Sequence, residues 1–180
     1  FESITKVIFF MRSRITSWFE TKVRYEKDME NGMQKFVTEQ YVVEALSFTE
    51  AEASITKEMS LYIRGEFKIT DIKPATYSEV VYSDAESDDK WYKAKLQFIT
   101  LDQKTEKEKL TTTLFLVQAG SVSRAVNNIT EMMSKTATDY TITSVVETKI
   151  MDVYEHTFTT KKEADDKPEY EEGENTENAE

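Results

Sequence analysis

The sequence predicts an α+β fold in which one strand-strand-helix-strand unit occurs twice. Three observations support this prediction: apolar and polar side chains alternate along pairs of segments, an amphipathic helical pattern follows each pair, and a tryptophan-centred motif recurs 73 residues later. Alternation is typical of half-buried strands, and apolar positions three or four residues apart are typical of helices. Because consecutive strands without long crossovers pair antiparallel, we expect mainly antiparallel sheet with the two helices on one side.

The repeat is clearest where WFETKVRY, residues 18–25, reappears as WYKAKLQF, residues 91–98. Further matches follow at spacings of 73 or 74: Thr38 and Thr112, Val43 and Val117, Ile55 and Ile129, and Met59 and Met133. Changes of spacing by one residue are expected in turns, because loops tolerate them. The two units are therefore expected at residues 18–82 and 91–155.

Each unit is expected to open with a hairpin and continue into a helix. In the first unit, residues 18–27 and 35–46 form the paired strands, and Asn31-Gly32 between them is typical of a type I′ turn. Thr49 and Glu52 form a capping-box pattern at the start of the helix. The helix is expected to end at Gly65, and its apolar face consists of Ala51, Ile55, Met59 and Tyr62.

The last strand of the first unit spans residues 67–82, and Pro74 is expected to bend it or to place it at a sheet edge. The second unit follows the same order, with strands at residues 90–101, 109–119 and 140–155 and a helix capped by Ser123. Its second strand is apolar on both faces, because Leu114 and Leu116 oppose Phe115. We expect the other unit or a second subunit to cover the outer face, and a second subunit would make the protein a homodimer.

Residues 83–89, SDAESDD, connect the two units and are expected to be solvated. Asp84, Glu86 and Asp88 alternate as in part of a calcium-binding loop, but the glycine and the closing glutamate of such a loop are absent. An acidic linker is therefore the favoured interpretation, and no metal site is predicted.

The 180 residues suit one compact domain, which is expected at residues 16–156. Residues 1–15 are expected to be an N-terminal extension, and those before Met11 are either an upstream extension or foreign to the native protein. Nine acidic residues and three lysines in residues 157–180 predict a disordered acidic tail, in a chain of net charge −11. The lack of cysteine and of any apolar run near roughly 20 residues excludes disulfides and a membrane-spanning helix, and it fits a cytoplasmic protein.

The sequence offers few parts for catalysis. His156 is the only histidine, and it lies where the expected domain meets the tail, so catalytic or metal-binding sets built on histidine are not expected. The four glycines form no phosphate-binding loop, which argues against a nucleotide-dependent enzyme. We therefore predict a protein that is not an enzyme and has no cofactor.

The outer face of the first strand in each unit is the main candidate for binding. If one face of these strands packs in the core, the other carries a tryptophan and two cations in both units: Trp18, Lys22, Arg24, Trp91, Lys93 and Lys95. Indole rings stack on bases without requiring a sequence, and cations neutralise phosphates. This combination predicts binding of single-stranded nucleic acid, along a track that Lys27, Lys35, Lys68 and Lys73 would extend.

Packing offers an alternative explanation of the same pattern. Each tryptophan would pack on its helix or on the other unit, and the lysines would be ordinary solvent-facing residues. The acidic balance of the expected domain also favours a protein-interaction role, because nucleic-acid binders usually have a basic domain. Buried tryptophans would favour this alternative, whereas a continuous basic groove that holds both tryptophans would favour nucleic acid.

Several segments resemble a family of small uncharacterised proteins, classed as a domain of unknown function, from Bacteroidales bacteria and their crAss-like phages. The resemblance spans residues 16–154 and is carried by WFETKVRYEK, ENGMQKFVTEQYVVEALSFTEAEA, ITDIK, KLQFITLD and TSVVETKIMDVY. Similar members begin close to the position of Met11, and the surroundings of their genes suggest functions in phage replication or mobile elements. The resemblance implies a non-catalytic single-stranded DNA-binding protein, with a virion-associated or other protein-interaction protein as the alternative.

Acidic tails of single-stranded DNA-binding proteins often compete with DNA for the basic groove and recruit replication proteins. We expect both roles for residues 157–180. Bacterial and phage tails of this kind commonly finish in an aromatic residue, whereas this chain finishes in Glu177-Asn178-Ala179-Glu180. That departure argues against docking of a replication protein through the tail tip.

Overall fold

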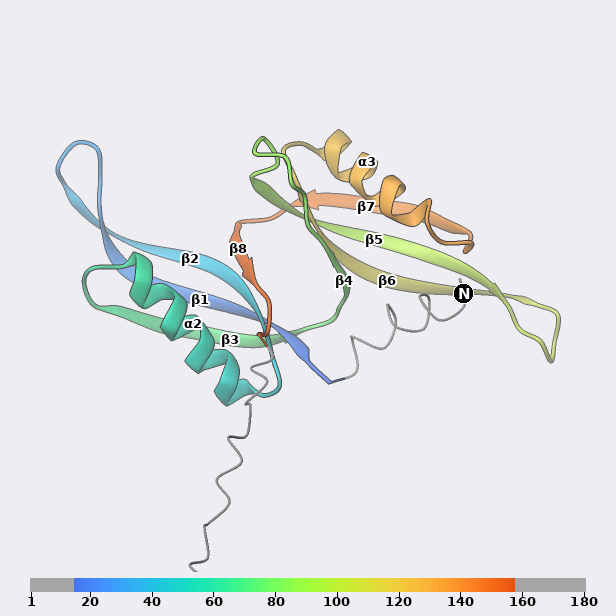
Figure 1. Cartoon of the computed structure of the whole chain (residues 1–180), viewed down its shortest axis with the longest axis horizontal. Coiled ribbons are helices and arrows are strands. Elements are labelled where there is room, and N and C mark those ends of the chain that lie inside the picture. Colours follow the sequence, from blue (N-terminus) through green and yellow to red (C-terminus); the bar gives the residue numbers. More distant parts are fainter. Residues whose placement is uncertain (1–14, 158–180) are drawn as a thin grey trace, which may run out of the picture.

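The computed structural model describes residues 15–157, which form two four-stranded sheets and two helices (Figure 1). Sheet A has the strand order β3-β1-β2-β8, and sheet B has the order β4-β6-β5-β7. The elements are β1 (Ser17–Asp28), β2 (Gln34–Ala45), α2 (Phe48–Tyr62), β3 (Phe67–Ala75), β4 (Tyr77–Val81), β5 (Lys90–Leu101), β6 (Glu108–Ala119), α3 (Val122–Met133), β7 (Tyr140–Glu147) and β8 (Ile150–Tyr154). This is the predicted α+β class; the expectations for residues 1–14 and 158–180 lie outside the described residues.

The long strand expected at the end of each unit is divided in two, and its parts join different sheets. β3 pairs with β1 at the edge of sheet A, whereas β4 pairs parallel to β6 in sheet B. In the same way β7 lies at the edge of sheet B, and β8 pairs parallel to β2 in sheet A. Each sheet therefore contains one strand from the other half of the chain, which the sequence pattern does not predict. Pro74 lies in edge strand β3, where a missing N–H is tolerated.

The helices cover different sheets, so the expectation that both lie on one side of a common sheet is wrong. α2 packs on sheet A and α3 packs on sheet B, because each hairpin forms the centre of its own sheet (Figure 1). The buried helical residues are Ala51, Ile55 and Met59 in α2 and Ala125, Ile129 and Met133 in α3. Tyr62, expected on the apolar face, is exposed.

Both helices are capped two residues earlier than predicted. The Ser47 hydroxyl accepts a hydrogen bond from the backbone N–H of Glu50, and Ser121 caps α3 in the same way. Both serines have extended backbone, which lets the hydroxyl reach a free N–H of the first turn. Thr49 and Ser123 already lie inside the helices and cannot serve as the cap.

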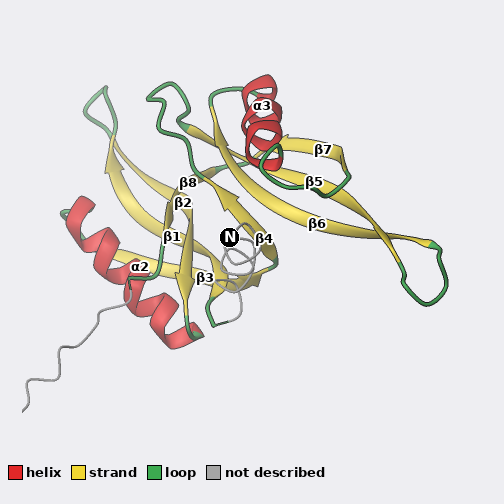
Figure 2. Ribbon diagram, turned by 45° about the vertical axis from the view of Figure 1, so that its right-hand side comes forward, coloured by secondary structure: helices red, strands yellow, loops and turns green. Residues whose placement is uncertain are grey.

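The hairpin between β1 and β2 forms as predicted, but its turn is not type I′. Such a turn needs positive φ at both central residues, whereas within residues 15–157 only Gly32 and Glu106 have it. The Asn31 side chain instead accepts a hydrogen bond from the N–H of Met33 at 3.1 Å, and Gly32 supplies the left-handed position. Both long hairpins reach beyond the helix that covers their sheet (Figure 2).

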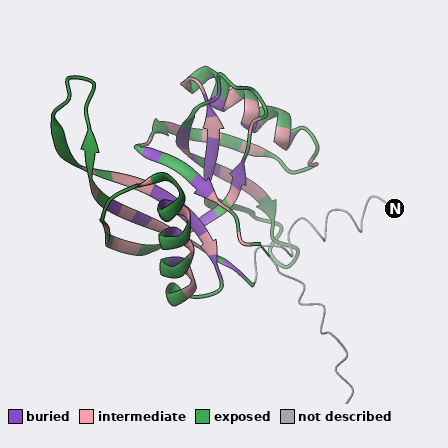
Figure 3. Cartoon of the chain, turned by 60° about the vertical axis from the view of Figure 1, so that its left-hand side comes forward, coloured by how far each residue is buried: buried purple, intermediate pink, exposed green. Residues whose placement is uncertain are grey.

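The sides of the sheets that the helices leave open meet each other over part of their area. A third apolar cluster fills this contact, and its buried members are Val42, Tyr77, Val80, Trp91, Leu116, Ile150 and Val153. Buried segments converge where the two sheets meet, while the outer part of the β1–β2 hairpin is exposed (Figure 3). The sequence predicts that the other unit or a second subunit covers the outer face of β6. For Leu116 this cover is the other half of the same chain.

The linker between β4 and β5 is not solvated throughout, because Asp88 is only 1% exposed. Its carboxylate accepts hydrogen bonds from the side chains of Ser83, Arg124 and Asn128 and from the backbone N–H of Gly120. These bonds hold the linker against the start of α3. They also hold the pKa of Asp88 well below its ordinary value, chiefly through Arg124 and then through Ser83.

Candidate functional site

The side of sheet A opposite α2 is open beyond the contact with sheet B, and it carries several cations. The strand register places one set of side chains on this side, which we call the cationic face: Lys22, Arg24, Glu26, Phe36, Thr38, Gln40, Lys68, Asp71 and Lys73. These residues come from β1, β2 and β3. The face is the continuation of the strand surface on which Trp18 lies.

Two cations oppose each other directly at the centre of the cationic face. Arg24 in β1 is the cross-strand partner of Lys68 in β3, and both side chains are exposed. Neither forms an ion pair with a carboxylate of residues 15–157. The Arg24 guanidinium lies 5.1 Å from the ring centroid of Phe36, which is itself 61% exposed. An aromatic ring and two unneutralised cations are thus available to solvent side by side.

The rest of the cationic face is partly neutralised. Asp71 lies between Lys22 and Lys73, with nitrogen-oxygen distances of 4.0 and 3.3 Å. Gln40 is the partner of Lys22 on the other neighbouring strand. Lys73 is also the cross-strand partner of Glu20, so this part of the face offers cations that are shared with two carboxylates.

Neither tryptophan of the predicted binding site is freely exposed on the surface. Trp91 is 2% exposed and lies in the cluster between the sheets, with its ring edge-to-face against Tyr82 at a centroid distance of 5.7 Å. Trp18 is half-buried and packs against the same cluster. The predicted strand face is right for both, but the other sheet covers it at this point. In this arrangement no base can stack on Trp91.

Lys93 forms an ion pair at the contact between the sheets, where its side chain is 37% exposed. Its Nζ atom donates a hydrogen bond to Oε1 of Glu20 at 2.7 Å and lies 5.7 Å from the ring centroid of Tyr77. Glu20 belongs to sheet A and Lys93 to sheet B, so this ion pair joins the sheets. Lys93 is thereby paired with a carboxylate, unlike Arg24, with which it was grouped by sequence.

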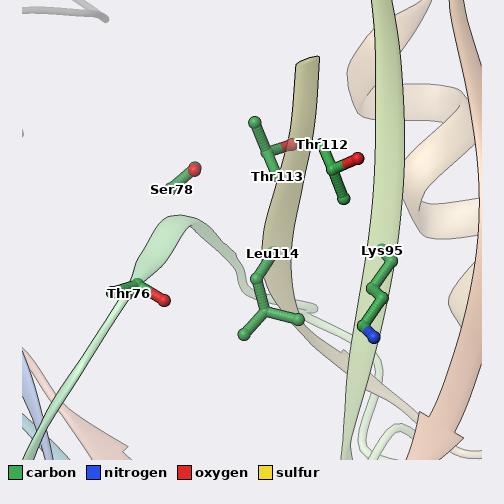
Figure 4. Close-up of a pocket in the computed structure, with 6 residues that line it drawn as sticks. All are labelled: Thr76, Ser78, Lys95, Thr112, Thr113 and Leu114. Atoms are coloured by element: carbon green, nitrogen blue, oxygen red, sulfur yellow. The ribbon is translucent and has the colours of Figure 1, made fainter. Parts of the chain in front are cut away.

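Lys95 is exposed and lines an open cavity of about 420 Å³ near the crossover from β3 to β4. The cavity wall is completed by Thr76, Ser78, Thr112, Thr113 and Leu114, which come from the start of β4 and from β6 (Figure 4). The lining combines one cation with several hydroxyl groups. It lacks the aromatic ring found on the cationic face.

The corresponding side of sheet B has the same register but different chemistry. Gln97 lies between Thr112 and Thr141, just as Arg24 lies between Thr38 and Lys68. Leu110 occupies the place in sheet B that Phe36 has in sheet A. Lys95 is the counterpart of Lys22, but the remaining positions are uncharged. Only sheet A therefore combines clustered cations with an exposed aromatic ring.

Residues 17–156 match a protein family described as "Domain of unknown function (DUF4494)". The chain belongs to this family. No curated protein and no solved structure matches it. The match covers almost all of the described residues of this DUF4494 protein and agrees with the resemblance to an uncharacterised family, but it assigns neither an activity nor a source.

The described part of this DUF4494 protein contains no group of three or more His, Asp or Glu side chains placed to hold a metal ion. Its most deeply buried carboxylate, Asp88, is fully hydrogen-bonded within the fold. No helix among residues 15–157 is both long and apolar enough to cross a membrane. The absence of enzymatic activity stays a prediction.

The main residue that the sequence analysis missed is Phe36. Its place on the cationic face follows from the pairing of residue 26 with residue 36 across the hairpin. Counting alternate positions outward from the Asn31-Gly32 turn predicts which face of β2 carries Phe36, but not whether this side chain is exposed. That exposure arises because sheet B covers only part of the side of sheet A opposite α2, and the sequence does not state where that cover ends.

Proposed function

We propose that this DUF4494 protein binds single-stranded DNA without catalysis, through the cationic face of sheet A. The observation that carries the proposal is the directly opposed pair Arg24 and Lys68 beside the exposed ring of Phe36. Like charges opposite each other on neighbouring strands destabilise a sheet. A bound phosphate between them turns this repulsion into two favourable contacts, which supports an anionic partner.

The aromatic ring supports nucleic acid over other anions. Phe36 is 61% exposed, and an unpaired base would stack on the ring face that Arg24 does not cover, while the neighbouring cations contact phosphates. In a duplex the faces of the bases are hidden by stacking, so a single strand uses the ring better. Stacking of this kind tolerates any base, which fits binding without sequence preference.

The proposal changes the roles of the six residues that the sequence suggested. Lys22 and Arg24 keep their role as phosphate contacts, and Lys95 is a further contact on the open side of sheet B. Trp18, Trp91 and Lys93 are assigned to packing and pairing between the sheets. Phe36 replaces the tryptophans as the stacking residue, and Lys68 and Lys73 join the phosphate contacts.

The acidic segment after the fold belongs to the same proposal. Residues 157–180 carry nine carboxylates and three lysines, so they compete with DNA for the cationic face and offer a site for replication proteins. We place the protein in the replication of a phage or mobile element, in the cytoplasm of a bacterial host. We also propose that the equal registers of the β1–β2 and β5–β6 hairpins derive from an internal duplication.

Conversion of the cationic face to the chemistry of sheet B tests the proposal. The variant R24Q/F36L/K68T places the counterparts Gln97, Leu110 and Thr141 at the same register positions, where this fold already accepts them. A fluorescein-labelled deoxythymidine oligonucleotide of about 16 nucleotides, at the upper end of typical site sizes, is titrated by anisotropy. We expect the loss of one stacked base alone to weaken binding by about 10- to 100-fold, and the slope of log K against log salt to become shallower by roughly 1.4 for two lost cations.

A matched control removes two cations elsewhere. K104T/K107T changes the exposed turn between β5 and β6 and should retain most of the wild-type affinity. The proposal fails if the wild-type protein leaves the anisotropy unchanged at low salt. The assignment to the cationic face fails if the triple variant binds as tightly as the control.

A protein-interaction role, such as that of a virion-associated structural protein without nucleic-acid binding, is the second candidate. The burial of Trp91 favours it, because a buried tryptophan is the feature expected of this alternative. The open side of sheet B favours it as well, because Leu110 and Val146 are 61% and 59% exposed on a largely uncharged surface. If the wild-type protein does not bind the oligonucleotide, this second role becomes the preferred one.

A further inference from the structure

The one ion pair that joins strands of the two sheets within residues 15–157 connects equivalent positions of the two hairpins. Glu20 faces Val42 on one neighbouring strand and Lys73 on the other, while Lys93 faces Leu116 and Val146 at the matching register. The two positions thus have the same place in their sheets and opposite charges. They meet at 2.7 Å.

Other equivalent positions meet in the same contact. Trp18 and Trp91, Val42 and Leu116, and Val80 and Val153 all belong to the cluster between the sheets. These apolar pairs have no preference for an unlike partner, because two copies of either member could pack together. Glu20 and Lys93 differ from these apolar pairs, because they carry opposite charges.

A third group makes the difference between the sheets larger. Tyr77 in sheet B is 6% exposed, and its hydroxyl donates a hydrogen bond to the same Oε1 atom of Glu20. Ile150 holds the matching position in sheet A, since Tyr77 pairs with Leu114 and Ile150 pairs with Gln40. Sheet B therefore supplies two donors and sheet A supplies the acceptor. Burial raises the pKa of Glu20, but the hydrogen bonds from Lys93 and Tyr77 outweigh burial and leave it below its ordinary value.

We propose that the surface between the sheets is an interaction surface that accepts only the unlike half, sheet A against sheet B. Two A surfaces would bring the carboxylates of two Glu20 residues together, and two B surfaces would bring two Lys93 side chains together. Such like charges repel each other, and solvent moderates the repulsion because the two side chains are 37% and 36% exposed. The apolar cluster stabilises the contact, and the charged pair determines which two surfaces can meet. This inference does not depend on DNA binding.

A charge-exchange series in the full-length chain tests this inference. E20K and K93E each place like charges at the contact, and we expect each to lower the melting temperature by about 2 to 4 °C in a chain of this size. The double variant E20K/K93E restores opposite charges, so it should recover most of that loss. Thermal unfolding followed by circular dichroism measures all three.

The pair Lys90–Glu147 provides the matched control. It joins the same residue types at 3.1 Å within sheet B, where both side chains are about half exposed. K90E, E147K and their double variant should stay close to the wild-type melting temperature. The inference is wrong if E20K and K93E lower the melting temperature no more than these controls do. It is also wrong if the two decreases simply add in E20K/K93E.

Neutral variants keep the test decisive if a reversed charge prevents folding. E20Q and K93Q are then compared with E20Q/K93Q. If the two residues are coupled, the double variant loses clearly less stability than the sum of the losses in the two single variants. Additive losses would overturn the proposed selection.

Discussion

Asp88 illustrates how one side chain can differ from the expectation for its segment. It lies in an acidic stretch that reads as a solvated linker, yet it is buried and accepts hydrogen bonds from Ser83, Asn128, Arg124 and the N–H of Gly120. A buried carboxylate is stable only when such partners satisfy it. Asp84 and Asp89 in the same segment are exposed, as expected for a solvated linker.

We predict that D88N lowers the free energy of unfolding by about 2 to 4 kcal/mol at pH 7, because charge-assisted hydrogen bonds are lost in a buried site. The folded state depresses the pKa of Asp88, so the unfolded state binds the proton first. The stabilisation is therefore complete above the ordinary pKa of about 4 and is lost as the pH falls below it.

Urea unfolding at pH 7 and pH 3 measures both effects. Acidification should cost the wild-type protein more stability than it costs D88N. D84N, a change at an exposed position of the same linker, should behave as wild type. Equal stability of D88N and D84N at pH 7 would contradict the prediction.

The turn from β6 into α3 depends on a close approach of two backbone segments. A Cβ atom on Gly120 would lie 2.4 Å from the carbonyl oxygen of Ser87, which is too close for any side chain. The same turn provides the N–H that binds Asp88 and is followed by Ser121, the cap of α3. The linker and the helix start therefore form one packed unit.

We predict that G120A destabilises the fold by about 1 to 3 kcal/mol, because the linker must move to admit the methyl group. G65A is the control, since a Cβ there meets no atom within 4 Å and φ is not positive. G65A should be neutral or stabilise by about 0.4 to 1 kcal/mol through a less flexible unfolded chain. Denaturant midpoints give both values, and a G120A midpoint equal to that of G65A would disprove the close approach.

Charge is unevenly distributed over the protein as a whole. The cationic face lies on one sheet of a chain with net charge −11, and a large share of the acidic excess lies in residues 157–180. Long-range attraction between these parts weakens as salt increases. Under the proposed function, the acidic segment therefore competes with DNA most strongly at low salt.

A version of the protein that ends at Thr157 should bind the labelled oligonucleotide several-fold more tightly than the full-length chain at low salt, and the difference should shrink as salt rises. The same anisotropy titration measures this change. A control that keeps residues 158–180 but replaces their acidic residues by the corresponding amides should behave like the truncated protein. Equal affinity of truncated and full-length protein at low salt would refute the competition.

Local rules predicted much of this fold. The alternation in residues 17–25 correctly placed Phe19 and Val23 in the core, and the helical spacing correctly identified Ile55 and Met59 as buried. These predictions succeeded because side-chain direction in a strand or helix depends on near neighbours along the chain. The same rule put Lys22 and Arg24 on the face opposite the helix.

Contacts between distant segments decided the rest. The exchange of β4 and β8 covers one end of each open sheet face, which buries Trp91 and engages Lys93 with Glu20 but leaves Arg24 and Phe36 exposed. The alternation of side chains predicts on which side of a strand a residue lies, and this prediction was correct for both tryptophans. Whether that side meets solvent or another sheet depends on packing between segments 73 residues apart, and no local pattern contains that information.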